Sequence, residues 1–414
     1  MIKARQTSTL VQQTSASPFG RILVLTGARQ TGKTTLARQL FQDYAYISLD
    51  DPVTRSRWAK LTSAQWKSLY PHAILDEVQK EPGLIEAIKA VYDLSPETRY
   101  VLLGSSQLLL LEKVKESLAG RCAIVEVFPL TLPELVTQTF DEEVKPSLWQ
   151  QLLQGRSLDL LPDAFLDPRH PAKGKAWSHY LSWGGYPALT QTENAVDRQL
   201  WLRNYVRTYL ERDVRDLANF RDLDAFTRLQ KRLALGTGTL VNASALAVEL
   251  GLSVKTVQRY LRYFELSYQA LSLAPWTKNP AKRLSKTPKV HYLDHGVLRA
   301  VLQREGDLTG HEFESLVTAE LYKQARALGL TAEFTHLRTV DGREVDVLVE
   351  TPRGYYAFEI KMAEKVSHSD GRALRGLQEF LDKPLLGSFV LSQDSETRPL
   401  IQGITAVQAA YFLG

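Results

Sequence analysis

The sequence predicts an α/β protein that begins with a parallel sheet covered by helices on both faces and continues into further, smaller domains. From Arg21 to about Phe128, β-rich runs such as RILVLT, AILDEVQ and YVLLGSS alternate with helical stretches, an order that produces crossover connections and a parallel sheet. From Trp177 to about Gly236, apolar residues recur at helical spacing. From Gly310 to the end, strand and helix patterns mix again.

Composition restricts the class of protein. The chain has 414 residues, and at about 150 residues per domain this length predicts two or three domains. The single cysteine, Cys122, excludes an internal disulfide. Neither the N-terminus nor any later run is apolar enough for a signal peptide or for the roughly 18 residues of a membrane span. We therefore expect a soluble, cytoplasmic protein with no membrane partner.

Positive charge is concentrated in the middle of the chain. The whole protein has a net charge of +5 and a pI of about 9.0. Between Lys255 and Lys289 there are eight basic residues and one acidic residue, Glu265, so this segment alone has a net charge of +7. Charge gathered in this way favours an anionic partner such as nucleic acid.

The stretch LTGARQTGKTT predicts a phosphate-binding loop. Gly27, Gly32, Lys33 and Thr34 fit G-x-x-x-x-G-K-S/T between an apolar strand and a helical run, the context that this motif requires. The glycines let backbone N–H groups surround phosphates, the lysine reaches the β- and γ-phosphates, and the threonine hydroxyl ligates Mg²⁺. We expect ATP and Mg²⁺ as cofactors, with nucleotide contacts from Gly27, Gln30, Thr31, Gly32, Lys33, Thr34 and Thr35.

Two further strands end in polar residues that suit ATP hydrolysis. AILDEVQ places Asp76 and Glu77 after an apolar strand. Asp76 would hold Mg²⁺ through water, and Glu77 would polarise the attacking water. YVLLGSSQ places Ser105 at the C-terminal end of the next strand, where a parallel sheet presents its ligand site. Its hydroxyl would sense the γ-phosphate, although a simple turn at the end of the strand explains the serine equally well.

The chain contains seven characteristic blocks in this order: LTGARQTGKTT, LDDP, ILDEVQKEPGLI, LLGSSQ, ESLAGR, GGYPAL and YLERDV. In these blocks it resembles the bacterial and archaeal AAA-superfamily ATPases that carry a C-terminal domain of unknown function. The resemblance implies an AAA-type ATPase core with a lid, and it makes Arg121 a candidate for contacting γ-phosphate in its own or a neighbouring subunit. Contact with a neighbour would require an oligomer, for which a ring such as a hexamer is expected. The alternative is that Arg121 pairs with an acid to hold the fold.

Residues 242–265 predict two helices joined by a tight turn at residues 251–253. Together with the hairpin that LSLAPWT and KVHYLD predict, they form the pattern of a winged helix. The second helix and the hairpin tip would contact DNA phosphates and bases through Lys255, Gln258, Arg259, Arg262, Lys282, Arg283 and Lys286. Winged helices also mediate protein contacts and domain docking, so a packing role is the alternative.

The C-terminal region has carboxylates in a pattern typical of metal-dependent nucleases. Asp346 lies on one predicted strand, and Glu359 and Lys361 lie on one face of the next. Two carboxylates can bind a second Mg²⁺ or Mn²⁺, and a nearby lysine can activate water. The pattern resembles the D-x(n)-E-x-K core of restriction-endonuclease-like folds, and the junction resolvases of that group add Glu314, with Glu320 as second choice. The alternatives are a fold kept for nucleic-acid binding or packing, and an ordinary Glu–Lys pair.

These observations predict four regions: an AAA-type P-loop ATPase domain over 1–157, a linker and helical lid over 158–236, a winged helix over 237–305 and a restriction-endonuclease-like domain over 306–414. The predicted function is an Mg²⁺-dependent ATPase that binds DNA and couples ATP binding and hydrolysis to DNA remodelling or branch migration, with metal-dependent cleavage as an additional activity. One alternative is a nucleotide-controlled signalling switch that acts through protein contacts. A second alternative is a nuclease whose cleavage is gated by ATP.

Overall fold

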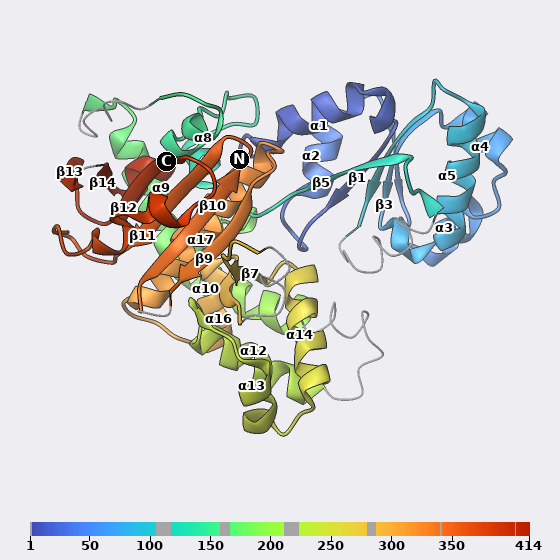
Figure 1. Ribbon diagram of the computed structural model, residues 1–414. Coiled ribbons are helices and arrows are strands. Elements are labelled where there is room, and N and C mark those ends of the chain that lie inside the picture. The colour runs from blue at the N-terminus through green and yellow to red at the C-terminus, as the bar shows by residue number, and fades with distance from the viewer. Residues whose placement is uncertain are drawn as a thin grey trace.

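The computed structural model describes residues 2–104, 117–157, 166–210, 223–279, 287–339, 342–401 and 403–414. Figure 1 shows three parts: a helix-flanked sheet of N-terminal residues, a larger sheet of mainly C-terminal residues, and a group of helices from the middle of the chain. We call them the N-terminal unit (residues 2–128), the C-terminal unit (residues 132–183 and 309–414) and the middle unit (residues 184–302). None of the described helices has both the length and the apolar character that a membrane crossing requires.

The N-terminal unit is built on a five-stranded parallel sheet in the order β2-β3-β4-β1-β5. Its elements are α1 (Thr7–Ala16), η1 (Pro18–Gly20), β1 (Ile22–Thr26), α2 (Lys33–Leu40), β2 (Ala45–Ser48), α3 (Pro52–Trp58), α4 (Ser63–Leu69), β3 (His72–Asp76), η2 (Val78–Lys80), α5 (Pro82–Leu94), β4 (Arg99–Leu103) and β5 (Cys122–Glu126). Ile22 and Val24 of β1 pack with α4 and α5, whereas Leu23 and Leu25 pack with α1 and α2. Helices therefore cover both faces of a parallel sheet, and the predicted α/β fold class is confirmed.

The C-terminal unit combines a mixed sheet with helices from two distant parts of the chain. Its elements are α7 (Leu132–Val136), α8 (Leu148–Leu153), α9 (His170–Trp183), α17 (Gly310–Ala327), β9 (Glu333–Arg338), β10 (Glu344–Thr351), β11 (Gly354–Ile360), η6 (Arg372–Leu374), η7 (Leu377–Phe380), β12 (Leu385–Ser392), β13 (Arg398–Ile401), β14 (Ile404–Gln408) and α18 (Ala409–Leu413). Trp149 of α8 packs with Phe358 and Phe412, and its indole N–H donates to the carbonyl oxygen of Leu321 at 2.9 Å. This core crosses the predicted boundary at residue 157.

The middle unit has one core that includes both the predicted lid and the predicted winged helix. Its elements are η4 (Pro187–Thr190), α10 (Ala195–Asn204), the π-helical turn η5 (Tyr205–Leu210), α12 (Leu223–Leu235), β6 (Thr239–Leu240), α13 (Ala243–Leu250), α14 (Val254–Leu266), β7 (Ala270–Pro275), β8 (Lys289–Tyr292) and α16 (His295–Leu302). Leu202, Phe226, Phe264 and Leu298 meet in this core. The predicted boundary at residue 236 therefore lies inside a single packed unit.

One sheet joins the middle and C-terminal units. In the described part of the chain its nine strands follow the order β13-β14-β12-β11-β10-β9-β7-β8-β6. The junction is a short parallel pairing of β7 with β9, in which Ala274 and Pro275 lie opposite Thr335 and His336. This pairing crosses the predicted boundary at residue 305, and it brings the start of β8 next to α17 and β10.

Candidate functional site

The nucleotide loop, residues 27–32, connects β1 with α2. Gly27 has φ 148°, Gln30 has φ 60° and Gly32 has φ 94°, and such positive values favour glycine. A Cβ atom on Gly27 would lie 2.2 Å from the carbonyl oxygen of Val127, just beyond β5. The first motif glycine is therefore required by the neighbouring strand as well as by the loop, and α2 begins directly after the second glycine.

Lys33 lies folded over this loop. Its Nζ donates to the carbonyl oxygens of Gly27 at 2.9 Å and Ala28 at 2.7 Å, and the residue is buried. Charged phosphate oxygens are stronger acceptors for an ammonium group than neutral carbonyls. Lys33 is therefore well placed to exchange these carbonyls for a phosphate bound in the loop.

Arg5 supports the loop from outside, a role that sequence analysis missed. Its buried guanidinium donates to the carbonyl oxygens of Thr31 at 2.7 Å and Phe128 at 2.6 Å, and it pairs with Glu134 at 3.3 Å. Beside this contact, a hollow of about 80 Å³ is lined by residues that include Gly32 and Thr35. No local motif marks Arg5, because its partners come from distant parts of the chain.

The two predicted Mg²⁺ ligands lie together. The Thr34 hydroxyl donates to Asp76 Oδ2 at 2.8 Å, and the Tyr46 hydroxyl donates to the same oxygen at 2.8 Å. A hydroxyl and a carboxylate at this spacing fit Mg²⁺, a hard cation that prefers oxygen ligands. Burial and the Asp76 carboxylate raise the pKa of Tyr46, which the sequence did not single out.

Glu77 follows Asp76 in a left-handed conformation with φ 56°. Its backbone N–H donates to Asp76 Oδ1 at 3.0 Å, and its carboxylate accepts a hydrogen bond from Gln79. Strand β4 lies between β1 and β3 and ends at Leu103. The C-terminal end of β4 therefore lies between the nucleotide loop and Asp76. The predicted γ-phosphate sensor, Ser105, lies outside the described residues.

Arg121 lies at the N-terminal ends of the sheet strands, whereas the nucleotide loop lies at their C-terminal ends. It precedes β5, whose first residue, Cys122, is opposite Ile22 at the start of β1, whereas the loop follows the end of β1. The two ends of β1 are four residues apart, and at about 3.3 Å per residue this separation is roughly 13 Å. Arg121 pairs with Asp93 through Nε at 2.8 Å and a second nitrogen at 3.2 Å. The geometry thus matches the predicted pairing with an acid and does not place Arg121 at its own subunit's phosphates.

One buried tyrosine of the middle unit, Tyr205, reaches the loop, and a second, Tyr186, bonds to it. The Tyr205 hydroxyl donates to the carbonyl oxygen of Arg29 at 3.3 Å and shares a hydrogen bond of 2.8 Å with the Tyr186 hydroxyl. Tyr186 belongs to the block GGYPAL, in which a Cβ atom on Gly185 would lie 2.2 Å from the carbonyl oxygen of Leu130. This block therefore packs against the chain that leaves the N-terminal sheet.

Tyr268 makes a second connection to the N-terminal unit. It follows α14 with φ 58°, its ring packs against Phe128 with centroids 5.5 Å apart, and its hydroxyl donates to Glu126 Oε1 at 3.2 Å. Ala28 of the nucleotide loop belongs to the same apolar cluster. Arg326 of α17 also pairs with Glu126. Glu126 therefore joins all three units, an arrangement that sequence analysis did not predict.

The C-terminal residues predicted as a nuclease site do come together. Glu314 lies on α17, Asp346 on β10, and Glu359 and Lys361 at the end of β11. Lys361 Nζ pairs with Glu359 at 2.6 Å, and Asp346 Oδ2 accepts a hydrogen bond from the Ile360 N–H at 2.8 Å. Burial, followed by the Asp346 carboxylate, raises the pKa of Glu314 to about 8 and that of Glu359 to about 7.

A lysine that the sequence did not single out enters this cluster of carboxylates. Lys289, the first residue of β8, directs its ammonium group toward Glu314, Glu344 and Asp346. Among the described residues, no group of three or more histidine, cysteine or acidic side chains has a geometry suited to metal binding. The predicted second Mg²⁺ or Mn²⁺ therefore does not fit this arrangement. The second-choice residue Glu320 is committed elsewhere, because it accepts a hydrogen bond from the Leu132 N–H at 2.7 Å.

The predicted DNA-contacting helix is α14, and it is amphipathic. Val257, Tyr260 and Phe264 are buried in the middle-unit core. The predicted contact residues on this helix are all exposed: Lys255, Gln258, Arg259 and Arg262. The other three, Lys282, Arg283 and Lys286, lie outside the described residues.

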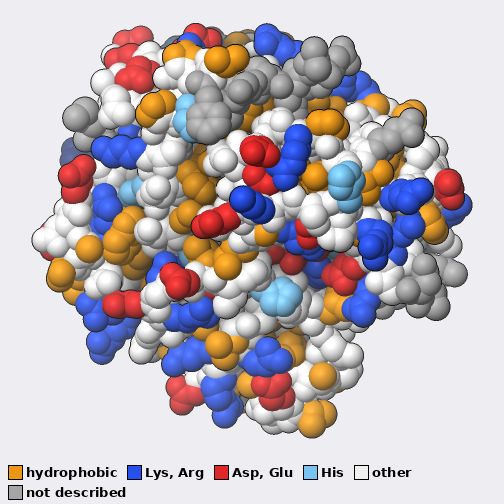
Figure 2. Space-filling model, turned by 90° about the vertical axis from the view of Figure 1, so that its left-hand side faces the viewer, with side chains coloured by type: hydrophobic (Ala, Val, Ile, Leu, Met, Phe, Trp, Pro, Cys, Tyr) orange, Lys and Arg blue, Asp and Glu red, His pale blue; other side chains and the backbone are white. Residues whose placement is uncertain are grey.

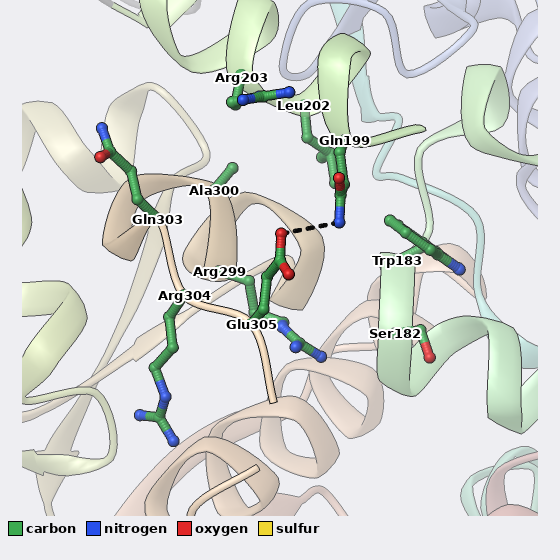
Figure 3. Close-up of a pocket in the computed structure, with 10 residues that line it drawn as sticks. All are labelled: Ser182, Trp183, Gln199, Leu202, Arg203, Arg299, Ala300, Gln303, Arg304 and Glu305. Atoms are coloured by element: carbon green, nitrogen blue, oxygen red, sulfur yellow. Dashed lines mark hydrogen bonds between the residues drawn. The ribbon is translucent and has the colours of Figure 1, made fainter. Parts of the chain in front are cut away.

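A separate hollow of about 340 Å³ lies between α9, α10 and α16 (Figure 3). A hydrogen bond of 3.0 Å from Gln199 to Glu305 lies among its lining residues. Arg304 points away from the other residues drawn in Figure 3 and bonds to Glu312 and to the carbonyl oxygen of Asp307. These hydrogen bonds serve the local fold, and none of the residues that line the hollow belongs to the nucleotide loop.

Comparison with known families agrees with the geometry of the loop. Residues 20–136 match the model of an AAA domain. The N-terminal unit is a P-loop ATPase domain of the AAA type. Residues 174–308 and 309–412 match two domains of unknown function, DUF8612 and DUF4143. The first of these matches ends near the end of α16, and the second begins at α17.

Two similar proteins cover nearly the whole chain, and a third covers most of it. Uncharacterized proteins of Mycobacterium bovis and Mycobacterium tuberculosis are each 28% identical over 404 residues, covering 95% of this chain and 81% of theirs. A Walker-type ATPase of Pyrococcus abyssi has a similar structure with a TM-score of 0.47 and 16% identity, covering 73% of this chain and 99% of that one.

Proposed function

We propose that the protein binds and hydrolyses ATP with Mg²⁺ and couples this cycle to the binding and remodelling, or branch migration, of DNA. The observation that carries the proposal is the contact of Tyr268 with the N-terminal unit. This tyrosine follows α14, whose exposed face is basic, and it contacts Glu126 and Phe128 beside the nucleotide loop. A nucleotide-dependent shift of the loop would therefore reach the proposed DNA-binding helix over a short, packed path.

The loop supports a conventional mechanism of phosphoryl transfer to water. Lys33 would leave the loop carbonyls and bind the β- and γ-phosphates. Thr34 and, through water, Asp76 would hold Mg²⁺, which neutralises phosphate charge when bound. Glu77 would accept a hydrogen bond from the attacking water, and Ser105 would sense the γ-phosphate. The hollow beside Gly32 would receive part of the rest of the nucleotide.

The basic face of α14 supports a DNA partner. Lys255, Arg259 and Arg262 are exposed on the same amphipathic helix, and phosphate neutralisation by such residues supplies most of the affinity of non-specific DNA binding. On the face of the molecule shown in Figure 2, by contrast, basic and acidic side chains are interspersed. Work on DNA by such a protein would take place in the cytoplasm.

We also propose that the active form is a homo-oligomer, for which a ring such as a hexamer is the expected arrangement. Arg121 lies far from its own nucleotide loop, and its side chain is 33% exposed. A γ-phosphate that it contacts would therefore belong to a neighbouring subunit. Size-exclusion chromatography with light scattering, with and without nucleotide, would test this assembly, and a monomer under all conditions would contradict it.

The proposal is tested by steady-state ATP hydrolysis with Mg²⁺, alone and with single-stranded, duplex and four-way-junction DNA. We expect one form of DNA to stimulate turnover, and we expect Lys33→Ala and Glu77→Gln to remove turnover. Tyr268→Ala should retain basal hydrolysis and DNA binding but lose the stimulation, whereas Tyr268→Phe, which keeps the ring against Phe128, should lose less. Equal turnover with every DNA, together with no binding, would refute a DNA-coupled ATPase.

A nucleotide-controlled switch that acts through protein contacts is the second candidate. Exposed apolar side chains of the middle unit favour it: Leu235 is 72% exposed, and Val248 of α13 is 85% exposed. Such residues on a folded surface are typical of a site for a protein partner when they are grouped. Two results together would support this function. The protein would hydrolyse ATP without binding DNA, and it would bind a protein partner with an affinity that the variant Val248→Asp abolishes.

A further inference from the structure

We infer that the Lys289 ammonium is the resident cation of the C-terminal carboxylate site and takes the place that a divalent metal ion would hold there. The inference is independent of whether the N-terminal unit hydrolyses ATP or binds DNA. It assigns a structural role to a cluster of carboxylates whose spacing in the sequence is typical of metal-dependent nucleases.

The geometry around Lys289 is that of a filled cation site. Its Nζ lies 3.1 Å from Glu314 Oε1, 2.5 Å from Glu344 Oε1 and 3.5 Å from Asp346 Oδ1. An ammonium group has three N–H donors and no acceptor, and this one lies within ion-pair distance of three acidic side chains, with a hydrogen bond to Glu314. The lysine side chain is 5% exposed, and those of Glu314 and Asp346 are each 9% exposed.

Two of the remaining oxygens of the cluster have hydrogen-bond partners, whereas Glu359 Oε2 is buried without one among the described residues. Asp346 uses its second oxygen for the Ile360 N–H at 2.8 Å, and Glu359 Oε1 binds Lys361 at 2.6 Å. Mg²⁺ requires several oxygens at about 2.0–2.1 Å in near-octahedral geometry. A divalent ion at the Lys289 position would have to displace the ammonium group, because two cations at that distance repel each other strongly in a buried site.

Displacement of Lys289 is opposed by the fold. Strand β8 pairs with β6 on one side and with β7 on the other, with Lys289 opposite Leu240 and Leu273. The backbone of Lys289 is therefore held by a strand on each side, and its side chain, which is 5% exposed, would have to leave a buried position to withdraw. The same ion pairs fasten the middle unit to α17 and β10, so the carboxylates serve as an anchor between units and not as a metal-dependent nuclease centre.

The test of this inference is whether the full-length protein binds Mn²⁺ in the absence of nucleotide. Binding is measured by calorimetry and by the change in the thermal unfolding midpoint. All variants carry Asp76→Asn, which removes a predicted metal ligand of the nucleotide site, so a failure of the ATPase proposal does not affect the result. We expect no Mn²⁺ binding in the Asp76→Asn parent. Lys289→Met should lower the midpoint, and Mn²⁺ should now bind and restore much of the loss.

Two matched controls make the result specific. Lys361→Met removes a lysine of the same cluster that binds Glu359 from a 37% exposed position, and it should gain no Mn²⁺ binding. Lys289→Met combined with Asp346→Asn should lose the binding gained by Lys289→Met alone. Mn²⁺ binding by the parent that Asp346→Asn removes would overturn the inference, as would a folded Lys289→Met protein that gains none. If Lys289→Met does not fold, the comparison of the parent with Asp346→Asn decides the question alone.

Discussion

Two buried lysines of this protein, Lys33 and Lys289, differ in the partners that the fold gives them. Lys33 lies over a loop whose glycines leave room for phosphates, and its ammonium group donates to the carbonyl oxygens of Gly27 and Ala28. Lys289 lies among carboxylates from α17 and β10. The carbonyls beside the first lysine are neutral and can be replaced by an anionic ligand, whereas the second lysine already has anionic partners. A polar motif becomes a ligand site only where the fold leaves its charge uncompensated.

The largest effect that tests this comparison is the loss of Lys289. Lys289→Met should lower the free energy of unfolding by about 3–5 kcal/mol, because it leaves buried carboxylates without their cation. ATP hydrolysis per folded molecule should stay close to that of the parent protein. Urea unfolding followed by circular dichroism measures the change, with Lys361→Met as a milder control. A Lys289→Met protein as stable as the parent would show that the ion pairs contribute nothing.

Loss of Lys33 should have the opposite signature. Lys33→Ala should reduce ATP turnover by at least about 10²–10³-fold, the scale expected when a charged donor to the transition state is removed. Its stability should change by no more than about 1 kcal/mol, because the hydrogen bonds to the loop carbonyls are individually weak. A phosphate-release assay and urea unfolding of the same preparation measure both quantities. Full residual turnover would remove Lys33 from the site.

Acid should weaken β8 and α16, which carry His291 and His295, before the N-terminal unit. Burial lowers the pKa of His291 and of His295 to about 3, with Lys289 the next cause for His291 and Arg299 for His295. As pH falls from 6.5 toward 3, the unfolded chain binds these protons and the folded chain does not. Each histidine should then reduce stability by about 1.4 kcal/mol per pH unit. The raised pKa values of Glu314 and Glu359 act in the opposite sense, because the folded chain binds those protons more readily than the unfolded chain.

Urea unfolding at pH 7 and at pH 5 measures this loss of stability, and His295→Gln serves as the control because it should make the pH dependence less steep. The N-terminal unit offers the comparison, since its one histidine, His72, is exposed. Amide hydrogen exchange at pH 5 that increases in β1 before it increases in α16 would contradict the predicted order.

The smallest expected effect concerns the basic face of α14. Reversing charge in the double variant Arg259→Glu, Arg262→Glu should weaken DNA binding and reduce the slope of log affinity against log salt concentration by about 1 for each phosphate that is no longer bound. Fluorescence anisotropy at several salt concentrations measures both. The pair Lys255→Gln and Gln258→Lys, which retains the net charge, serves as a control. Unchanged binding by the charge-reversed protein would favour the protein-contact switch.

Much of the N-terminal unit could be predicted because its information is local. Strand and helix patterns alternate between residues 21 and 128, and the loop motif lies between one strand and one helix, so neighbours in sequence are neighbours in space. The boundaries between the predicted domains were harder to predict, because segments that are distant in the sequence pack together there. Helices α7 and α8 pack on α17, the lid and the middle helices share a core, and β7 pairs with β9.

By itself, the sequence determined the α/β fold class, the phosphate-binding loop and four residues of the C-terminal cluster: Glu314, Asp346, Glu359 and Lys361. Only the tertiary structure decided that Tyr268 touches Glu126, that Arg121 lies far from its own loop, and that Lys289 enters the carboxylate cluster. The physical reason is that a loop's conformation depends on adjacent residues, whereas the partner of a buried charge depends on which distant strand packs beside it. Charge compensation at a distance has no spacing that a sequence can display.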